Sequence, residues 1–126
     1  MSKSGNGKRI LMIDDDITSL DIVSFLFEDR GYQVERCSGG EPALELLASQ
    51  KFELVLIDMM MPGLNGVETV SEIRSRALTD SPIIAFTATE DPELHKQARE
   101  AGCSKVLLKP IQPKQLIAEV EEFLTA

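Results

Sequence analysis

The sequence predicts an α/β protein in which five strands form a doubly wound parallel sheet, with a helix after each strand. Two observations indicate this fold. Short apolar runs bounded by polar or turn residues are typical of buried strands, and they alternate with stretches whose apolar residues recur at helical spacing. Parallel strands need right-handed crossovers, and the crossover helices then cover both faces of the sheet. The expected elements, strands and helices in turn, are 9–13, 18–30, 32–37, 41–50, 54–57, 65–76, 83–86, 91–102, 105–108 and a helix from 113.

Residues with known preferences for helix ends support these boundaries. Thr18 resembles an N-terminal cap, and Gly31 follows the last apolar residue of the first helix. Pro42, Pro92 and Pro113 lie at the start of later helices, where a missing backbone N–H costs little. The second strand alternates apolar and polar side chains, which favours a position near an edge of the sheet.

Polar side chains follow four of the predicted strands directly. Asp14 and Asp15 follow the first strand, Asp58 the third, Thr87 the fourth and Lys109 the fifth. The carboxyl ends of parallel strands lie at one edge, where ligands collect in open α/β sheets, so these groups are expected to meet. Clustered carboxylates repel one another unless a cation lies among them, and Mg²⁺ suits such oxygen ligands. With an amine and a hydroxyl nearby, Asp58 is a candidate nucleophile toward phosphorus.

On these residues the chain resembles a receiver domain of the two-component response regulators, and it is similar in length to the single-domain chemotaxis response regulator. The resemblance covers residues 8–124. It depends on four motifs in the right order, which are residues 13–16, 57–66, 86–88 and 108–111. Each motif is unspecific alone, but together they are a strong signal. The resemblance implies a flavodoxin-like fold with strand order 2-1-3-4-5.

The resemblance also implies roles for the acidic residues. Asp58 would accept a phosphoryl group from a histidine kinase or a histidine phosphotransfer protein. Asp15 and Asp58 would bind Mg²⁺ directly, Asp14 would bind it through water, and the backbone carbonyl of Met60 would complete the protein ligands. The domain would then be a phosphoacceptor switch of two-component signal transduction. It would catalyse its own phosphorylation and slow dephosphorylation, rather than turn over a substrate.

Further implied roles concern the strand ends beside the phosphoacceptor. Lys109 and Thr87 would contact the phosphoryl group, Thr87 moving toward it, and the bond from Lys109 to Pro110 would be cis. Receivers often carry an aromatic residue or histidine where this chain has Val106, so the output signal would pass through the loop or helix after Thr87. Residues 104–105 lack the acidic side chains of one common type of receiver dimer, which favours a monomer or weak dimer.

Composition indicates one small domain, expected at residues 9–126 after a polar, flexible leader at 1–8. The chain has 126 residues, 43% of them hydrophobic, and a net charge of −8. That charge argues against direct nucleic-acid binding and favours neutral or basic protein partners. With no membrane-length apolar stretch and no signal-like start, the expected location is the cytoplasm, without membrane contact. Cys37 and Cys103 are expected to be reduced.

Two other interpretations compete with a phosphoacceptor switch. The spacing of Asp14, Asp16 and Thr18 also fits the nucleophile motif of dehalogenase-type phosphohydrolases, but that interpretation lacks a later acidic pair for the metal and leaves residues 58–66 unexplained. A non-phosphorylated interaction module would not need the acidic cluster. His95, on a polar helix, is interpreted as a solvated side chain.

Two questions concern chemistry and context. Met60 and Thr89 flank the site and lack a carboxylate or amide to position water, which predicts a long-lived acyl phosphate. The sequence names no kinase, target or signal, and it is compatible with a free-standing receiver, a piece of a larger regulator or a carrier in a phosphorelay.

Overall fold

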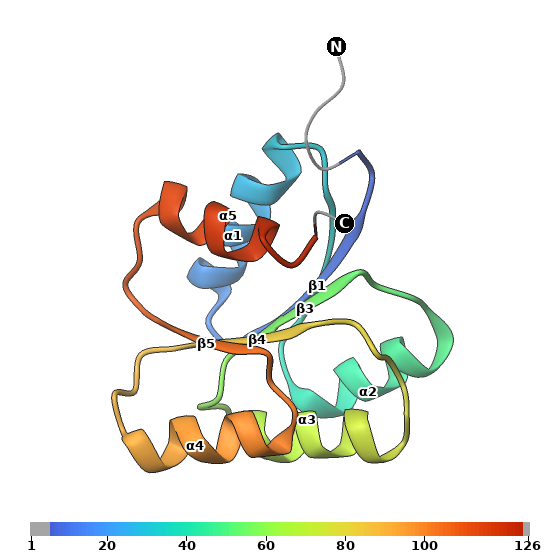
Figure 1. Ribbon diagram of the computed structural model, residues 1–126. Helices are drawn as coiled ribbons and strands as arrows, with labels where there is room; N and C mark the ends of the chain where they lie inside the picture. Colours follow the sequence, from blue (N-terminus) through green and yellow to red (C-terminus); the bar gives the residue numbers. More distant parts are fainter. Residues whose placement is uncertain (1–5, 125–126) are drawn as a thin grey trace.

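A computed structural model of the chain describes residues 6–124 and shows a parallel sheet between two layers of helices (Figure 1). The strand order is β2-β1-β3-β4-β5, as the sequence predicted. The strands are β1 (Arg9–Ile13), β2 (Gln33–Cys37), β3 (Leu54–Ile57), β4 (Ile83–Thr87) and β5 (Lys105–Leu108). The helices are α1 (Ile17–Asp29), α2 (Gly40–Ser49), α3 (Gly66–Ser75), α4 (Pro92–Ala101) and α5 (Pro113–Glu121).

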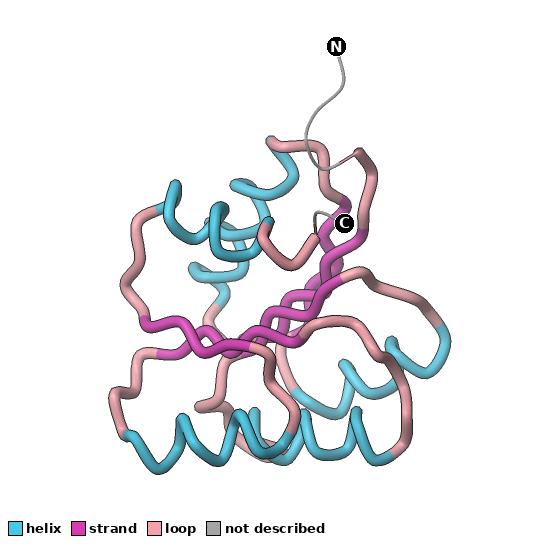
Figure 2. Tube along the Cα trace, in the orientation of Figure 1, coloured by secondary structure: helices cyan, strands magenta, loops and turns pink. Residues whose placement is uncertain are grey.

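The sheet separates two hydrophobic cores, because successive side chains of a strand point to opposite faces. Ile10 and Met12 of β1 pack on the side of α1 and α5, around the fully buried Phe27. Leu11 and Ile13 pack on the opposite side, against α2, α3 and α4. Figure 2 shows the twisted sheet between these two helical layers. Burial on both faces explains why the central strands read as unbroken apolar runs in the sequence.

The edge strands differ from the central strands in exposure. β2 pairs only with β1 along its length and leaves Gln33, Glu35 and Arg36 exposed, which confirms the edge position predicted for this segment. β3 and β4, in contrast, are buried at every residue. The carboxyl ends of β1, β3 and β4 therefore emerge from the buried centre of the sheet.

Helix ends follow the sequence signals, with one correction. Asp16, and not Thr18, caps α1, because its side chain accepts a hydrogen bond from the Thr18 backbone N–H. Asp16 precedes the first helical residue and is placed to satisfy that otherwise unpaired donor. Pro92 and Pro113 lie in the first turn of their helices as predicted. Asn65 and Glu68 form a capping box at the start of α3, which follows the segment that carries Asp58.

The predicted leader falls partly outside the described residues, so its boundary stays a prediction. Within the described part, the Gly7 N–H donates to the Gly31 carbonyl, and the Lys8 carbonyl accepts from the Gln33 N–H. Cys37 and Cys103 are buried and carry free thiols, as expected. None of the helices among residues 6–124 has the length and hydrophobicity required to cross a bilayer.

Candidate functional site

The topology brings the polar residues that follow four strands to one edge of the sheet. Ile13 of β1 pairs with Ile57 of β3, so Asp14 and Asp58 leave the sheet at the same level. Backbone hydrogen bonds continue past the strands, because the Asp58 N–H donates to the Ile13 carbonyl at 2.9 Å. On the other side, the Lys109 N–H donates to the Thr87 carbonyl at 2.9 Å. The backbone of the site is thus an extension of the sheet itself.

Three carboxylates form the acidic centre of this edge. One oxygen from each of Asp14, Asp15 and Asp58 lies within 4.8 Å of the others. Asp14 is almost fully buried at 1% exposure, Asp15 is exposed and Asp58 is intermediate. Closely spaced carboxylates favour a bound cation, and Mg²⁺ matches a set of hard oxygen ligands that is open to water on one side. The donor set therefore fits the metal that the sequence predicted.

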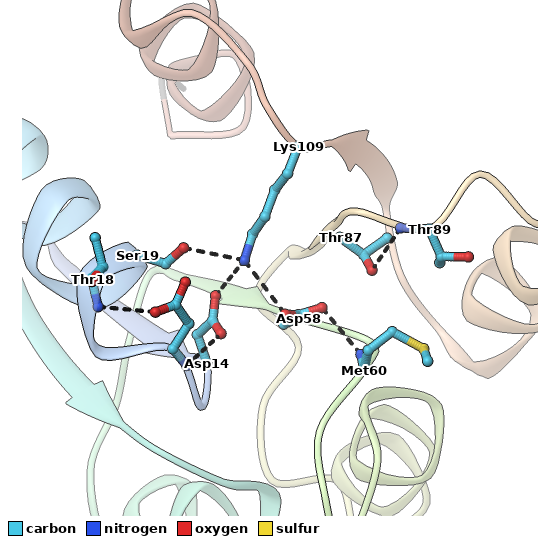
Figure 3. Close-up of polar contacts among 9 residues, drawn as sticks. Asp14, Thr18, Ser19, Asp58, Met60, Thr87, Thr89 and Lys109 are labelled. Atoms are coloured by element: carbon cyan, nitrogen blue, oxygen red, sulfur yellow. Dashed lines mark hydrogen bonds and ion pairs between the residues drawn. The ribbon is translucent and has the colours of Figure 1, made fainter.

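Lys109 reaches into this acidic centre from the end of β5 (Figure 3). Its Nζ lies 2.6 Å from Oδ2 of Asp14, 3.4 Å from Oδ2 of Asp58 and 3.4 Å from Oγ of Ser19. The amine also lies 5.1 Å from the centre of the Phe86 ring. Burial lowers the pKa of the Lys109 amine, but the hydrogen bond to Asp14 and the charges of both carboxylates outweigh burial and raise its pKa above the ordinary value. Lys109 is a fixed cation at neutral pH.

The segment after β3 shapes the surroundings of Asp58. The Met60 N–H donates to Oδ1 of Asp58 at 3.1 Å, whereas the Met60 side chain is 60% exposed to solvent. Gly66 begins α3 directly against this segment, and a Cβ at that position would lie 2.5 Å from the Asp58 carbonyl oxygen and 2.4 Å from Cα of Met59. Only glycine permits this approach, so the glycine of the predicted turn motif has a steric reason.

Thr87 ends β4 with its side chain fully buried. Its Oγ1 accepts a hydrogen bond from the Thr89 N–H at 3.5 Å, and this is the contact that Figure 3 draws for the hydroxyl. The bond between Lys109 and Pro110 is cis, as the resemblance implied.

Two contacts were not anticipated from the sequence. Ser19 and Phe86 both line the approach of Lys109 to the carboxylates, yet neither was selected as a candidate. Ser19 lies one helical turn after Asp15, so its spacing could have indicated that it faces the site. Phe86 looked like an ordinary core residue of a strand, and nothing in the sequence separates its ring contact from simple burial.

The geometry does not support a phosphohydrolase built on Asp14 and Asp16. In such an enzyme Asp16 would face the reacting group, but here it is exposed and its carboxylate caps α1. Both oxygens of Asp14 are engaged, since Oδ1 accepts from the Asp16 N–H at 3.0 Å and Oδ2 accepts from Lys109 at 2.6 Å. Of Asp14 and Asp58, Asp58 has the more accessible carboxylate.

The fold and the site define a phosphorylation-switch domain of the receiver class. A family model described as the response regulator receiver domain matches residues 10–121, and the chain belongs to that family. A similar curated protein is the transcriptional regulatory protein CpxR homolog of Haemophilus influenzae, 36% identical over 116 residues, which are 92% of this chain and 50% of that protein. The chain thus spans about half the length of the relatives of this kind that it matches.

Solved structures agree with this assignment. The chemotaxis protein CheY4 of Vibrio cholerae superposes with a TM-score of 0.87 and 28% identity, covering 93% of this chain and 98% of that one. The receiver domain of the sensor histidine kinase PA1611 from Pseudomonas aeruginosa, solved with a magnesium ion coordinated in its active-site cleft, has a TM-score of 0.87 and 25% identity. That comparison covers 95% of this chain and 99% of the other. The fold and the receiver assignment made from the sequence are confirmed.

Proposed function

We propose that Asp58 accepts a phosphoryl group from a histidine of a kinase or phosphotransfer protein, in the presence of Mg²⁺, and that the acyl phosphate switches a protein-interaction surface. The observation that carries this proposal is the position of the Lys109 amine, 2.6 Å from Asp14 and 3.4 Å from Asp58, within the three-carboxylate cluster. A fixed cation beside a partly open carboxylate is arranged to stabilise the charge of a transferring phosphoryl group.

The chemistry assigned to Asp58 is a displacement at phosphorus. An Asp58 carboxylate oxygen forms a bond to phosphorus while the bond from phosphorus to the donor imidazole breaks, and the imidazole keeps the electron pair. Lys109 is close enough to Asp58, at 3.4 Å, to neutralise charge on the phosphoryl oxygens. Bound Mg²⁺ would supply further positive charge between the carboxylates and the phosphoryl oxygens. Thr87 would donate its hydroxyl hydrogen to a phosphoryl oxygen after a rotation away from Thr89.

The hydrogen bonds of the carboxylates support a division of the metal ligands. Asp14 is nearly buried and lies closer to Lys109, at 2.6 Å, than Asp58 does, at 3.4 Å, which favours a contact of Asp14 with Mg²⁺ through water. Asp15 is exposed, and with Asp58 and the backbone carbonyl of Met60 it would bind the ion directly. The magnesium ion in the active-site cleft of the PA1611 receiver domain supports this placement by analogy.

Apolar side chains beside the site support a protein partner that docks on α1. Ile17, Ile22 and Phe25 of α1 are 67%, 55% and 69% exposed. Ile22 also borders a hollow of about 220 Å³ that extends to Lys109 and Ile111. Exposed apolar side chains next to a phosphoacceptor fit a partner that must hold its histidine close to Asp58. We also propose that the domain acts on a downstream protein target. It would do so in the cytoplasm, as a monomer or a weak dimer.

Intact-mass spectrometry after incubation with acetyl phosphate and Mg²⁺ tests this function. The expected result is the gain of one phosphoryl group, which is lost in Asp58→Asn and after chelation of the metal. Asp80→Asn is the matched control, because Asp80 is an exposed aspartate in the loop before β4, and it should be labelled normally. An unlabelled wild type with an intact fold would favour the non-phosphorylated module. Continuous phosphate release that is independent of Asp58 would instead support the phosphohydrolase.

A further inference from the structure

His95 of α4 makes a specific contact that its polar sequence surroundings do not suggest. The sequence interpretation placed this histidine in solvent, but the side chain is half-buried, and its Nε2 lies 2.7 Å from the backbone carbonyl oxygen of Thr89. A carbonyl oxygen only accepts hydrogen bonds, so Nε2 carries the hydrogen and donates it. The ring thus connects α4 to the loop between β4 and α4.

This bond is the shortest of the three hydrogen bonds to Thr89 that involve a side chain in the described structure. The Thr89 N–H donates to Oγ1 of Thr87 at 3.5 Å, and Oγ1 of Thr89 accepts from the Asp91 N–H at 3.3 Å. Both distances are at the weak end of hydrogen bonding, whereas 2.7 Å is short for a nitrogen donor. By distance, the bond from His95 is the strongest of these three contacts of Thr89.

Thr89 in turn donates its backbone N–H to the Thr87 hydroxyl. In Figure 3 a hydrogen bond joins the Thr87 hydroxyl to the Thr89 N–H, and none is drawn from Thr87 to the Asp58 carboxylate. In the proposed function the Thr87 hydroxyl moves to donate to a phosphoryl group on Asp58, and the loop that carries Thr89 would move with it because the two residues are hydrogen-bonded. Any bond that stabilises the loop as it stands opposes that change.

We propose that His95 is a positioning residue that holds the loop of residues 88–91 through the Thr89 carbonyl, and thereby restrains Thr87 from engaging a phosphoryl group on Asp58. The proposal rests on the proposed function, in which Thr87 contacts that group. His95 acts in it through Thr89 and Thr87 and touches none of the reacting atoms. Its bond sets the equilibrium between two arrangements of the loop.

The surface beside His95 has room for the second arrangement. A hollow of about 430 Å³ lies between α4, β5 and α5, and its lining includes His95, Val106, Gln115 and Glu119. Val106 is a small side chain that leaves this space open. The hollow borders His95, so open volume is available beside the imidazole for a rotation away from Thr89.

The test is the affinity for beryllofluoride, a tetrahedral phosphoryl mimic, measured with Mg²⁺ by NMR titration of the full chain. His95→Leu keeps the side-chain bulk and removes the donor, so it should tighten beryllofluoride binding by about 2- to 10-fold, as expected for one lost hydrogen bond. His95→Gln places an amide N–H near the position of Nε2 and should restore the wild-type affinity. Gln97→Ala, at an exposed position on the same helix, is the matched control and should change nothing.

A double-mutant comparison tests the route of the effect. In a Thr87→Ala background, His95→Leu should no longer alter beryllofluoride affinity, because the residue through which it acts is missing. An equal effect with and without Thr87 would overturn the proposal, as would an unchanged or weaker affinity of His95→Leu. Failure of His95→Gln to restore the wild-type value would also overturn it, since bulk and not the hydrogen bond would then be responsible.

A spectroscopic readout separates this role from general stabilisation of α4. Long-range proton–nitrogen NMR spectra should show a protonated Nε2 in the resting domain, and the Thr89 amide resonance should shift in His95→Leu but not in Gln97→Ala. An unprotonated Nε2 in the resting domain would contradict the bond. Absence of beryllofluoride binding by the wild type would overturn the proposed function and this inference together, whereas wild-type binding with an unchanged His95→Leu overturns the inference only.

Discussion

Lys109 and Asp14 form an ion pair, with 2.6 Å between Nζ and Oδ2, in which the Asp14 side chain is almost completely enclosed. The lysine thus occupies the acidic centre as a built-in cation. Lys109→Met should tighten Mg²⁺ binding several-fold, because it removes positive charge next to the carboxylates. The same change should slow labelling by acetyl phosphate, since the phosphoryl oxygens lose their partner. Calorimetric Mg²⁺ titration and intact-mass kinetics measure the two effects.

The matched control for this variant is Lys51→Met, which changes net charge equally at an exposed position before β3. It should leave both quantities within error of the wild type. Weaker Mg²⁺ binding in Lys109→Met would show that the lysine supports the carboxylates and does not compete with the ion.

The ionisation of the buried Tyr32 phenol makes the stability of the fold depend on pH. Burial and then the hydrogen bond to Glu121, at 2.8 Å, raise the pKa of the Tyr32 phenol well above its ordinary value of 10.0. Tyr32 therefore favours the folded state at all pH values below about 10, and this contribution falls as pH rises toward the folded-state pKa. Tyr32→Phe should lower the free energy of unfolding by about 1–2 kcal/mol near neutral pH. Above pH 10, the free energy of unfolding should fall less steeply with pH in the variant than in the wild type.

Absorbance measures this directly, because the chain contains one tyrosine and no tryptophan. The tyrosinate signal of the folded protein should stay low beyond pH 10, and it should rise at lower pH in Glu121→Gln. Ionisation of the folded wild type at the ordinary pKa would refute the buried hydrogen bond.

Arg74 connects three segments through backbone carbonyl groups. Its guanidinium donates to the carbonyl oxygens of Thr79 at 2.9 Å, Ser81 at 3.0 Å and Gly102 at 3.1 Å. Arg74→Met leaves these acceptors without the donor and should lower the free energy of unfolding by about 1.5–3 kcal/mol in urea denaturation. Arg76→Ala is the control, because its ion pair with Glu72 is exposed, and it should cost no more than about 0.5 kcal/mol. Equal losses in the two variants would contradict the connecting role of Arg74.

Gly66 couples stability to the geometry of Asp58. Gly66→Ala would place a Cβ 2.4 Å from Cα of Met59 and 2.5 Å from the Asp58 carbonyl oxygen, so backbone must move. We expect a loss of about 1–3 kcal/mol and slower labelling by acetyl phosphate, measured at a temperature at which the variant is folded. Gly39→Ala should be close to neutral, since the added Cβ would meet Cδ of Pro42 at 3.8 Å, an ordinary van der Waals distance. Normal labelling in Gly66→Ala would show that the site tolerates a shifted loop.

The acyl phosphate on Asp58 should persist. Met60 is largely exposed, and neither Met60 nor Thr89 carries a carboxylate or amide that could position an attacking water. Met60→Asn, which introduces an amide at the same place, should shorten the lifetime, whereas Met60→Leu should not. The decay of labelled protein after removal of acetyl phosphate, followed by intact mass at neutral pH, measures this. Loss of the wild-type label within seconds would contradict the prediction.

Local sequence signals predicted most of the fold. Buried central strands such as residues 54–57 are continuous apolar runs because both faces of a parallel sheet are covered, and that pattern is visible in the sequence. The residues at which helices begin were predicted less accurately than the strands. Thr18 and Asp16 are both good capping residues, and only the course of the backbone decided that Asp16 caps α1.

The candidate site was predictable as a set of residues because four strand ends of a parallel sheet must share one edge. The sequence by itself determined the fold class and the family, and it predicted that Asp14, Asp15, Asp58, Thr87 and Lys109 share one edge of the sheet. Only the tertiary structure decided which groups touch within and around that cluster. Lys109 with Ser19 and Phe86, and His95 with Thr89, are contacts of side chains whose direction depends on packing between separate elements, and no local pattern in the sequence encodes that direction.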